Sequence, residues 1–249
     1  MSVRSDYRWQ QFFALWAFMF DAFTFAGLEI FWPQPPSFDL TAQQTADLYV
    51  AHQTGFRIGI TLCTIGMAFL LAWTVQFGLM LWRLEGGSHA VSAVTIASLA
   101  ASPVLLSFDL AIFGIAAFRP AETSPDVTRA LSDLAWISSQ LIWPMLALGM
   151  AVSGLLILRT QGKPGSFPAW LGYFGLVCAV AELGQAGIIF EKSGPFAGDG
   201  AFSWYLATFT WGPWALAAGW VMYRMLQRQA EAVPATIEGA TMAGTVGAA

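Results

Sequence analysis

The chain has 249 residues, of which 57% are hydrophobic and only 10% are charged, and its formal net charge is −4. Soluble domains carry about 25% charged residues, so this composition excludes a cytoplasmic globular enzyme and a disordered chain. A nucleic-acid-binding protein would need a basic excess, which is missing here. The composition predicts an all-α fold, a polytopic bundle of transmembrane helices with about 20 apolar residues in each span.

Six apolar runs, separated by turns that contain Gly or Pro, predict about six membrane spans. A polar segment, 41–53, carries helix-forming residues behind a Thr41 cap and predicts a surface helix between the first two spans. The first apolar run is too long for a signal peptide and lacks a small-residue cleavage site, so we expect an uncleaved helix. The predicted spans are 11–32, 57–82, 90–118, 134–158, 169–190 and 203–225.

The basic residues predict how the bundle is oriented. Seven of the eleven Lys and Arg residues fall on the side that holds both termini, and four fall on the other side. Cytoplasmic loops are enriched in Lys and Arg, so both termini are expected in the cytoplasm. The expected organisation is a six-helix membrane domain at 1–229 followed by a disordered tail at 230–249.

Three carboxyl groups fall well inside predicted spans, where a charge costs about 2.5–3.5 kcal/mol on insertion scales. They belong to Asp21, Asp109 and Glu182. At helical spacing Ser102 shares a stripe with Asp109, and Gln185 shares a face with Glu182. Such side chains normally face the bundle interior, so we expect these polar faces to converge on a cavity in the outer half of the membrane.

The hypothesis is a ligand site in which acidic and amide side chains lie beside tryptophan side chains. Trp204 is expected to line this site as well. The candidate ligand-binding residues are Asp21, Asp109, Glu182, Arg57, Asp133, Gln140, Gln185, Trp136, Trp143 and Trp211.

Structural roles stay open for the same residues. Arg57 could form a buried ion pair with Asp109 or Glu182 that fixes the register of two helices. A carboxyl group could instead be protonated and donate to a backbone carbonyl or a glutamine. Arg57 and Asp133 lie close enough to the outer interface to reach water, and the deep tryptophans could serve only as packing.

The sequence contains no pattern for a metal or a cofactor. His52 and His89 fall on opposite sides of the predicted membrane and cannot share a metal ion. Cys63 and Cys178 lie in separate apolar stretches, without metal-type spacing. No lysine lies within a span and no nucleotide-binding motif is present, so the prediction is that no cofactor and no metal are bound.

Three motifs in the last 120 residues or so carry a resemblance: SDLAW at 132–136, FPAWLGYF at 167–174 and KSGPFAGDGAFSWYL at 192–206. They resemble an uncharacterised family of bacterial six-span integral membrane proteins. The resemblance implies a protein of the bacterial inner membrane, and it assigns no catalytic residue. It also implies that Asp133 caps the start of the fourth span. The residues that it marks for testing are Asp133, Trp136, Trp170, Gly194, Pro195 and Phe196.

Three functions are compatible with these features. The leading hypothesis is a bundle that binds or transports a small lipophilic or cationic molecule in an outward-facing cavity. The second is an intramembrane acid/base enzyme, an isomerase or cyclase acting on an isoprenoid or sterol-like lipid. The third is a structural subunit of a membrane complex. The expected partners are the lipid bilayer, a lipophilic small molecule, and a second copy or a membrane partner subunit, with no nucleic acid.

Overall fold

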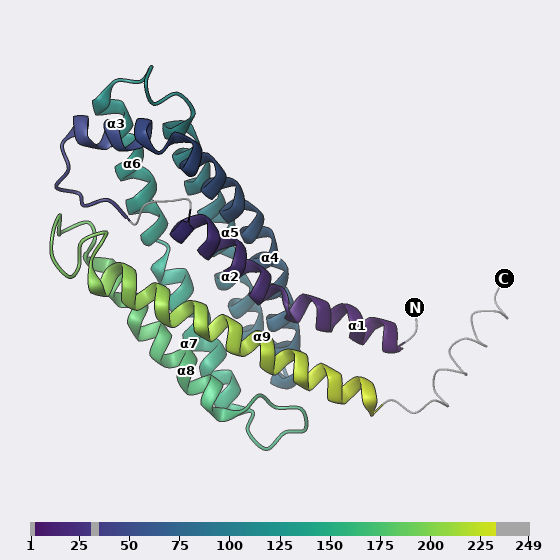
Figure 1. The fold of residues 1–249 in the computed structure, drawn as a ribbon. Coiled ribbons are helices and arrows are strands. Elements are labelled where there is room, and N and C mark those ends of the chain that lie inside the picture. Colours follow the sequence, from purple (N-terminus) through teal and green to yellow (C-terminus); the bar gives the residue numbers. More distant parts are fainter. Residues whose placement is uncertain (1–2, 31–34, 233–249) are drawn as a thin grey trace.

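The structure is a computed structural model that describes residues 3–30 and 35–232, and within these ranges it contains helices, turns and loops but no strand (Figure 1). The all-α prediction is therefore confirmed. The last helix ends at Glu231. The rest of the predicted disordered tail, from residue 233, lies outside the described residues.

Five helical stretches are long and apolar enough to cross a membrane. Their outward faces carry large hydrophobic side chains such as Phe108 and Val180, which are 68% and 67% exposed. An apolar surface of this kind needs lipid as its solvent. The five stretches are Ser5–Leu28, Gln53–Glu85, Ala90–Phe118, Pro125–Arg159 and Ala169–Gly187.

The second and third helical runs are continuous, as their sequences predict. Helix α4 spans Gln53–Glu85, and helix α5 spans Ala90–Phe118, the same residues as the predicted third span. The predicted surface helix is also present, as α3 over Ala42–Ala51. Its N-terminus forms a capping box, in which the Thr41 hydroxyl accepts from the backbone N–H of Gln44 and the side-chain oxygen of Gln44 accepts from the backbone N–H of Thr41.

The other four runs are interrupted. The first consists of α1 (Val3–Ala14), α2 (Trp16–Phe25) and a π-helical turn, η1 (Ala26–Ile30). In the fourth, α6 (Pro125–Gln140) is separated from α7 (Trp143–Arg159) by a turn. In the fifth, α8 (Ala169–Ala181) continues as a 3₁₀ helix, η2 (Glu182–Gly187). The sixth starts as a π-helical turn, η3 (Ala201–Leu206), and continues as α9 (Ala207–Glu231).

The fourth run begins earlier than predicted, and this corrects the role expected of Asp133. Helix α6 starts at Pro125 behind an N-cap at Ser124, so Asp133 lies two turns inside the helix and does not cap it. Proline at the first helical position is a recognised start signal, because its missing N–H and fixed φ both suit that position. The predicted spans leave Ser124 and Pro125 in the connection between the third and fourth spans.

The six runs form a closed ring in chain order. α2 contacts α4, α4 contacts α5, α5 contacts α6 and α7, α7 contacts α8, α8 contacts α9, and α9 returns to α1 and α2. The start of α1 and the end of α9 lie at the same end of the bundle, which we call the termini end (Figure 1). Helix α3 lies at the opposite end, which we call the α3 end.

Helices α7 and α8 approach so closely that only glycine fits between them. A Cβ atom on Gly154 would lie 2.7 Å from the Gly172 carbonyl oxygen, and one on Gly172 would lie 2.9 Å from that of Gly154. Membrane helices gain their attraction from such close packing, because lipid and apolar side chains are equally apolar and burial adds little.

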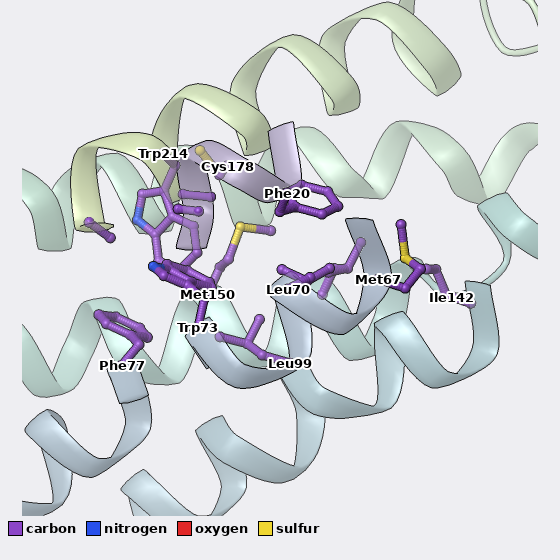
Figure 2. Close-up of a cluster of buried hydrophobic side chains, with 14 of the residues drawn as sticks. Phe20, Met67, Leu70, Trp73, Phe77, Leu99, Ile142, Met150, Cys178 and Trp214 are labelled. Carbon is purple, nitrogen blue, oxygen red and sulfur yellow. The ribbon is translucent and has the colours of Figure 1, made fainter. Parts of the chain in front are cut away.

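An aromatic cluster fills the bundle towards the termini end. Trp73 stacks on Phe77 with ring centroids 5.5 Å apart, and Trp214 meets both rings edge-on, at 5.9 and 5.6 Å. Phe167 packs edge-on against Phe77. These four side chains are at most 1% exposed. In Figure 2 the core runs from this cluster towards Phe20, Met67 and Ile142, where the packing is interrupted by a cavity.

Candidate functional site: a central acidic cavity

A cavity of about 160 Å³ lies inside the ring, and all six helical runs contribute to its walls. Ordinary protein interiors contain few voids larger than a water molecule, so a space of this size at the centre of a bundle needs an explanation. The lining residues differ from the aromatic cluster in chemistry, because they combine acids and amides with rings. Its polar and aromatic lining residues are Asp109, Glu182, Gln140, Gln185, Ser139, Thr24, Thr208, Trp136, Trp204, Trp211, Phe20 and Phe113.

Asp109, on α5, provides the first carboxyl group. The residue is only 4% exposed. Its Oδ1 accepts a hydrogen bond of 2.6 Å from the Ser138 hydroxyl of α6, whereas its Oδ2 is buried without a hydrogen-bond partner. A buried carboxyl oxygen without a partner is costly, so this atom is available to a ligand donor.

Glu182 provides the second carboxyl group, and local helix geometry positions it. It is 1% exposed and begins the 3₁₀ segment η2. Side chains three residues apart eclipse in a 3₁₀ helix, and the Gln185 amide accordingly donates to Glu182 Oε2 at 2.8 Å. The predicted pairing of these two side chains on one face is confirmed.

Aromatic rings form much of the remaining wall. Trp136 lies edge-on to Trp204 with centroids 5.5 Å apart, and Phe113 lies edge-on to Trp136 at 4.8 Å. On the other side, Phe20 meets Trp211 edge-on at 5.1 Å. The faces of indole rings attract cations, so this wall and the two carboxyl groups favour the same type of ligand.

Gln140 connects the cavity to the loop between η2 and η3, residues 188–200. Its amide donates to the Gly198 carbonyl at 2.9 Å, while its Oε1 is buried without a partner. The loop is folded back on the bundle: Phe202 N–H donates to the Pro195 carbonyl at 2.8 Å, and Phe196 packs on Phe202. The loop turns at Gly194, whose φ of +94° suits glycine.

Each of the four interrupted runs has an irregular segment that reaches the cavity. Leu28 of η1, Ile142 of the α6–α7 turn, Glu182 of η2 and Trp204 of η3 line it. π-helical turns and 3₁₀ stretches inside helices frequently mark functional sites, because regular helix geometry is given up to aim side chains. Four of the six runs lose regular α-geometry at the level of the cavity.

Arg57 lies outside the site, and the expected ion pair with Asp109 or Glu182 is not present. Its guanidinium donates to the backbone carbonyls of Ala117 and Phe118 at the end of α5, and it lies over the Phe118 ring at 5.6 Å. These bonds satisfy carbonyls that a helix C-terminus leaves open. Within the described residues, no Lys, Arg or His lines the cavity.

Asp21 is buried beside the cavity but does not line it. It is 6% exposed, and neither carboxyl oxygen has a hydrogen-bond partner. It faces α9, where a Cβ on Gly212 would lie 3.6 Å from Asp21 Oδ1. Its neighbour Phe20 is the residue of α2 that reaches both the cavity and Trp211.

Two other predicted site residues also lie elsewhere. Asp133 faces Arg129 on the same helix, with 3.7 Å between the charged groups, and both side chains are more than a third exposed. Trp143 begins α7 and is not a lining residue. In contrast, Gln140, Gln185, Trp136 and Trp211 do line the cavity, together with Asp109 and Glu182.

Sequence reasoning missed several lining residues, among them Thr24, Thr208 and Met67. Helical spacing contained a signal for two of them. Thr24 lies three residues after Asp21, and Thr208 lies four residues after Trp204 and three before Trp211, so each shares a face with a predicted residue. Met67 carried no signal, since an apolar residue in an apolar helix is equally suited to every face.

The two cysteines have different positions. Cys63 lines the cavity, whereas Cys178 is fully buried away from it, with its thiol 3.3 Å from the Thr210 carbonyl. Both thiols are free. Among the residues that the structure describes, no three His, Cys, Asp or Glu side chains are grouped so as to hold a metal ion.

A scan against protein-family models, a search of curated proteins and a search of solved structures gave no match. The resemblance to a family of bacterial six-span proteins therefore stays a prediction, and the cavity is the feature from which a function can be inferred.

Proposed function

We propose that this protein binds, and as a carrier transports, a small lipophilic cation in its central cavity. The observation that supports this proposal is the lining: two carboxyl groups and two amides among indole rings, with no basic side chain in the described part of the wall. A cation neutralises the acids and lies against the rings, so one ligand class satisfies both features.

The size of the cavity limits the ligand. A cavity of roughly 150 Å³ in another protein holds one benzene molecule, whereas pockets for drug-sized ligands measure about 300–1,000 Å³. At about 160 Å³, this cavity accommodates a compact group such as a trimethylammonium with a short alkyl chain, or one end of a longer molecule. A whole sterol would not fit.

An acid/base enzyme is the second candidate, because Asp109 and Glu182 border the same cavity. One carboxyl could donate a proton to an isoprenoid double bond while the other takes one up. An enzyme would lose turnover but retain substrate binding in Glu182→Gln. A carrier would lose binding or transport in the same variant, which separates the two functions.

The proposal includes six spans in a bacterial inner membrane, with both termini in the cytoplasm. The sixth span would be α9 with η3, whose Trp, Thr, Gly and Pro residues give low hydropathy although the helix closes the ring between α8 and α2. Arg83, Arg159 and Lys163 lie on loops or helix ends at the termini end, as expected for a cytoplasmic face.

The topology can be tested with fusions at the C-terminus. A fluorescent protein fused after Glu231 should fluoresce. Alkaline phosphatase fused there should be inactive, and an active fusion would place the C-terminus outside the cytoplasm and refute this topology.

The binding test uses butyltrimethylammonium as the probe and 2,2-dimethylhexane, its neutral carbon analogue, as the control ligand. The ammonium should bind to purified protein and slow the alkylation of Cys63, with Cys178 as the internal reference. Asp109→Asn and Glu182→Gln should each weaken binding about tenfold or more, because a hydrogen bond or contact to a charged group contributes about 1.5–3 kcal/mol.

The matched control is Glu122→Gln, which removes an acid from the surface loop where Glu122 pairs with Arg119. This variant should bind like the wild type. Equal affinity in all three variants, or equal affinity for the charged and neutral probes, would refute a cation site. A role as a subunit of a membrane complex would instead appear as a stable partner, or a second copy, copurifying at native expression level.

A further inference from the structure

A second depression lies on the outer face of the bundle, between α5 and the α6–α7 run. It has a volume of about 430 Å³ and lies among exposed apolar side chains. Phe108 and Leu134 on its rim are 68% and 52% exposed. Its apolar lining consists of Leu105, Phe108, Ile112, Ile115, Leu131, Leu134, Leu141, Ile142 and Met145. We call it the α5–α6 groove.

The two polar residues of the α5–α6 groove are Asp109 and Ser138, which are hydrogen-bonded to each other. Asp109 also lines the central cavity, as does Ile142. These two side chains therefore form the partition between the groove and the cavity. Because Ser138 occupies only Oδ1, the unpartnered Oδ2 of a residue that is 96% buried remains at this partition.

Asp109 lies too deep for the headgroup of an ordinary bilayer lipid. It is nine residues from the end of α5 at Phe118. At 1.5 Å per residue it lies about 14 Å from that end of the helix. A phospholipid anchored at the interface could place only its acyl chain here, and an acyl chain offers nothing to a carboxyl oxygen. A ligand complementary to Asp109 must therefore be an amphiphile whose cationic group itself reaches the depth of Asp109.

We propose that the α5–α6 groove is the lateral binding site of a single-chain cationic amphiphile, with the ammonium group at Asp109 and the alkyl chain along Phe108, Ile112 and Leu134. This inference rests on the proposed function and extends it from a compact cation to an alkylammonium that enters from the membrane. The groove holds the chain that the cavity is too small to enclose.

The test uses dodecyltrimethylammonium with a photoreactive diazirine in the middle of its chain. After irradiation in lipid nanodiscs, mass spectrometry should locate the label on residues of α5 and α6 that line the groove. Butyltrimethylammonium, which carries the same headgroup, should compete for this labelling. Asp109→Asn should reduce it about tenfold, as expected for the loss of one charge-assisted contact.

Leu134→Trp fills the groove and should lower labelling there while leaving the affinity for butyltrimethylammonium unchanged. Leu155→Trp is the matched control, because Leu155 is also a lipid-facing leucine, 57% exposed, outside the groove. Label spread evenly over the lipid-facing surface, or resistant to butyltrimethylammonium, would overturn the groove proposal. Failure of butyltrimethylammonium to bind at all would instead refute the cavity as a cation site.

Discussion

The aromatic cluster around Trp214 and the acidic cavity around Asp109 are built from the same helices, yet they are packed in opposite ways. In the cluster, four aromatic side chains fill the interior and are at most 1% exposed. In the cavity, the runs lose regular α-geometry, and the atoms without partners include a carboxyl and an amide oxygen, whereas in the cluster they are the indole N–H groups of Trp73 and Trp214. A protein selected only for stability would fill both regions, and this difference is the reason for proposing a ligand in the cavity.

The largest expected effect compares two tryptophans one turn apart on α9. Trp214→Ala should reduce the free energy of unfolding by about 3–5 kcal/mol, because it empties a filled core. Trp211→Ala should cost clearly less, since Trp211 is half-buried and already borders empty space. Thermal unfolding of both variants in the same detergent measures the difference. Equal losses would mean that the two regions are packed alike.

A medium effect of opposite sign is expected at Asp21. Asp21→Leu replaces a buried carboxyl group without hydrogen-bond partners by an apolar group of similar shape. Removing an unsatisfied buried polar group should raise stability by about 1–3 kcal/mol. The measurement is the midpoint of thermal unfolding without ligand. A fall in stability would show that Asp21 has a partner that stabilises it.

The smallest effect is expected at Gln140, which connects the cavity to the loop 188–200. Gln140→Leu removes the hydrogen bond to the Gly198 carbonyl and should cost about 1 kcal/mol. Hydrogen exchange should increase in residues 194–200 and stay unchanged in the aromatic cluster. An increase that spread to Trp73 and Phe77 would show that the two regions are coupled.

The sequence was sufficient for the regular parts of the fold. The third span coincided with α5, and the Thr41 cap correctly began α3, because apolar periodicity and caps act locally. The two buried acids of the cavity could also be identified, since lipid would not tolerate them. The 3₁₀ segment at Glu182 could not be predicted, because no local signal marks it. The turn after Gln140 did have one, since α7 begins at Trp143 with a proline in its first turn.

The same reason explains the misplaced residues. Arg57 was a reasonable ion-pair partner by depth alone, but the end of α5 offered it open carbonyl groups. Trp143 and Trp136 could not be distinguished by composition, because only the turn between α6 and α7 decides which of them points inwards. Depth in the membrane can be read from a sequence, whereas rotation about a broken helix cannot.

The closed ring has a consequence for biosynthesis. The seam between the first and last runs forms only when α9 packs on α1 and α2, which requires the whole membrane domain to be synthesised. Until then, Glu182 and the other polar side chains have lipid or neighbouring proteins in place of their final surroundings. A chain truncated before Ala207 would therefore lack the helix that completes the ring, and its acids would be open to the membrane.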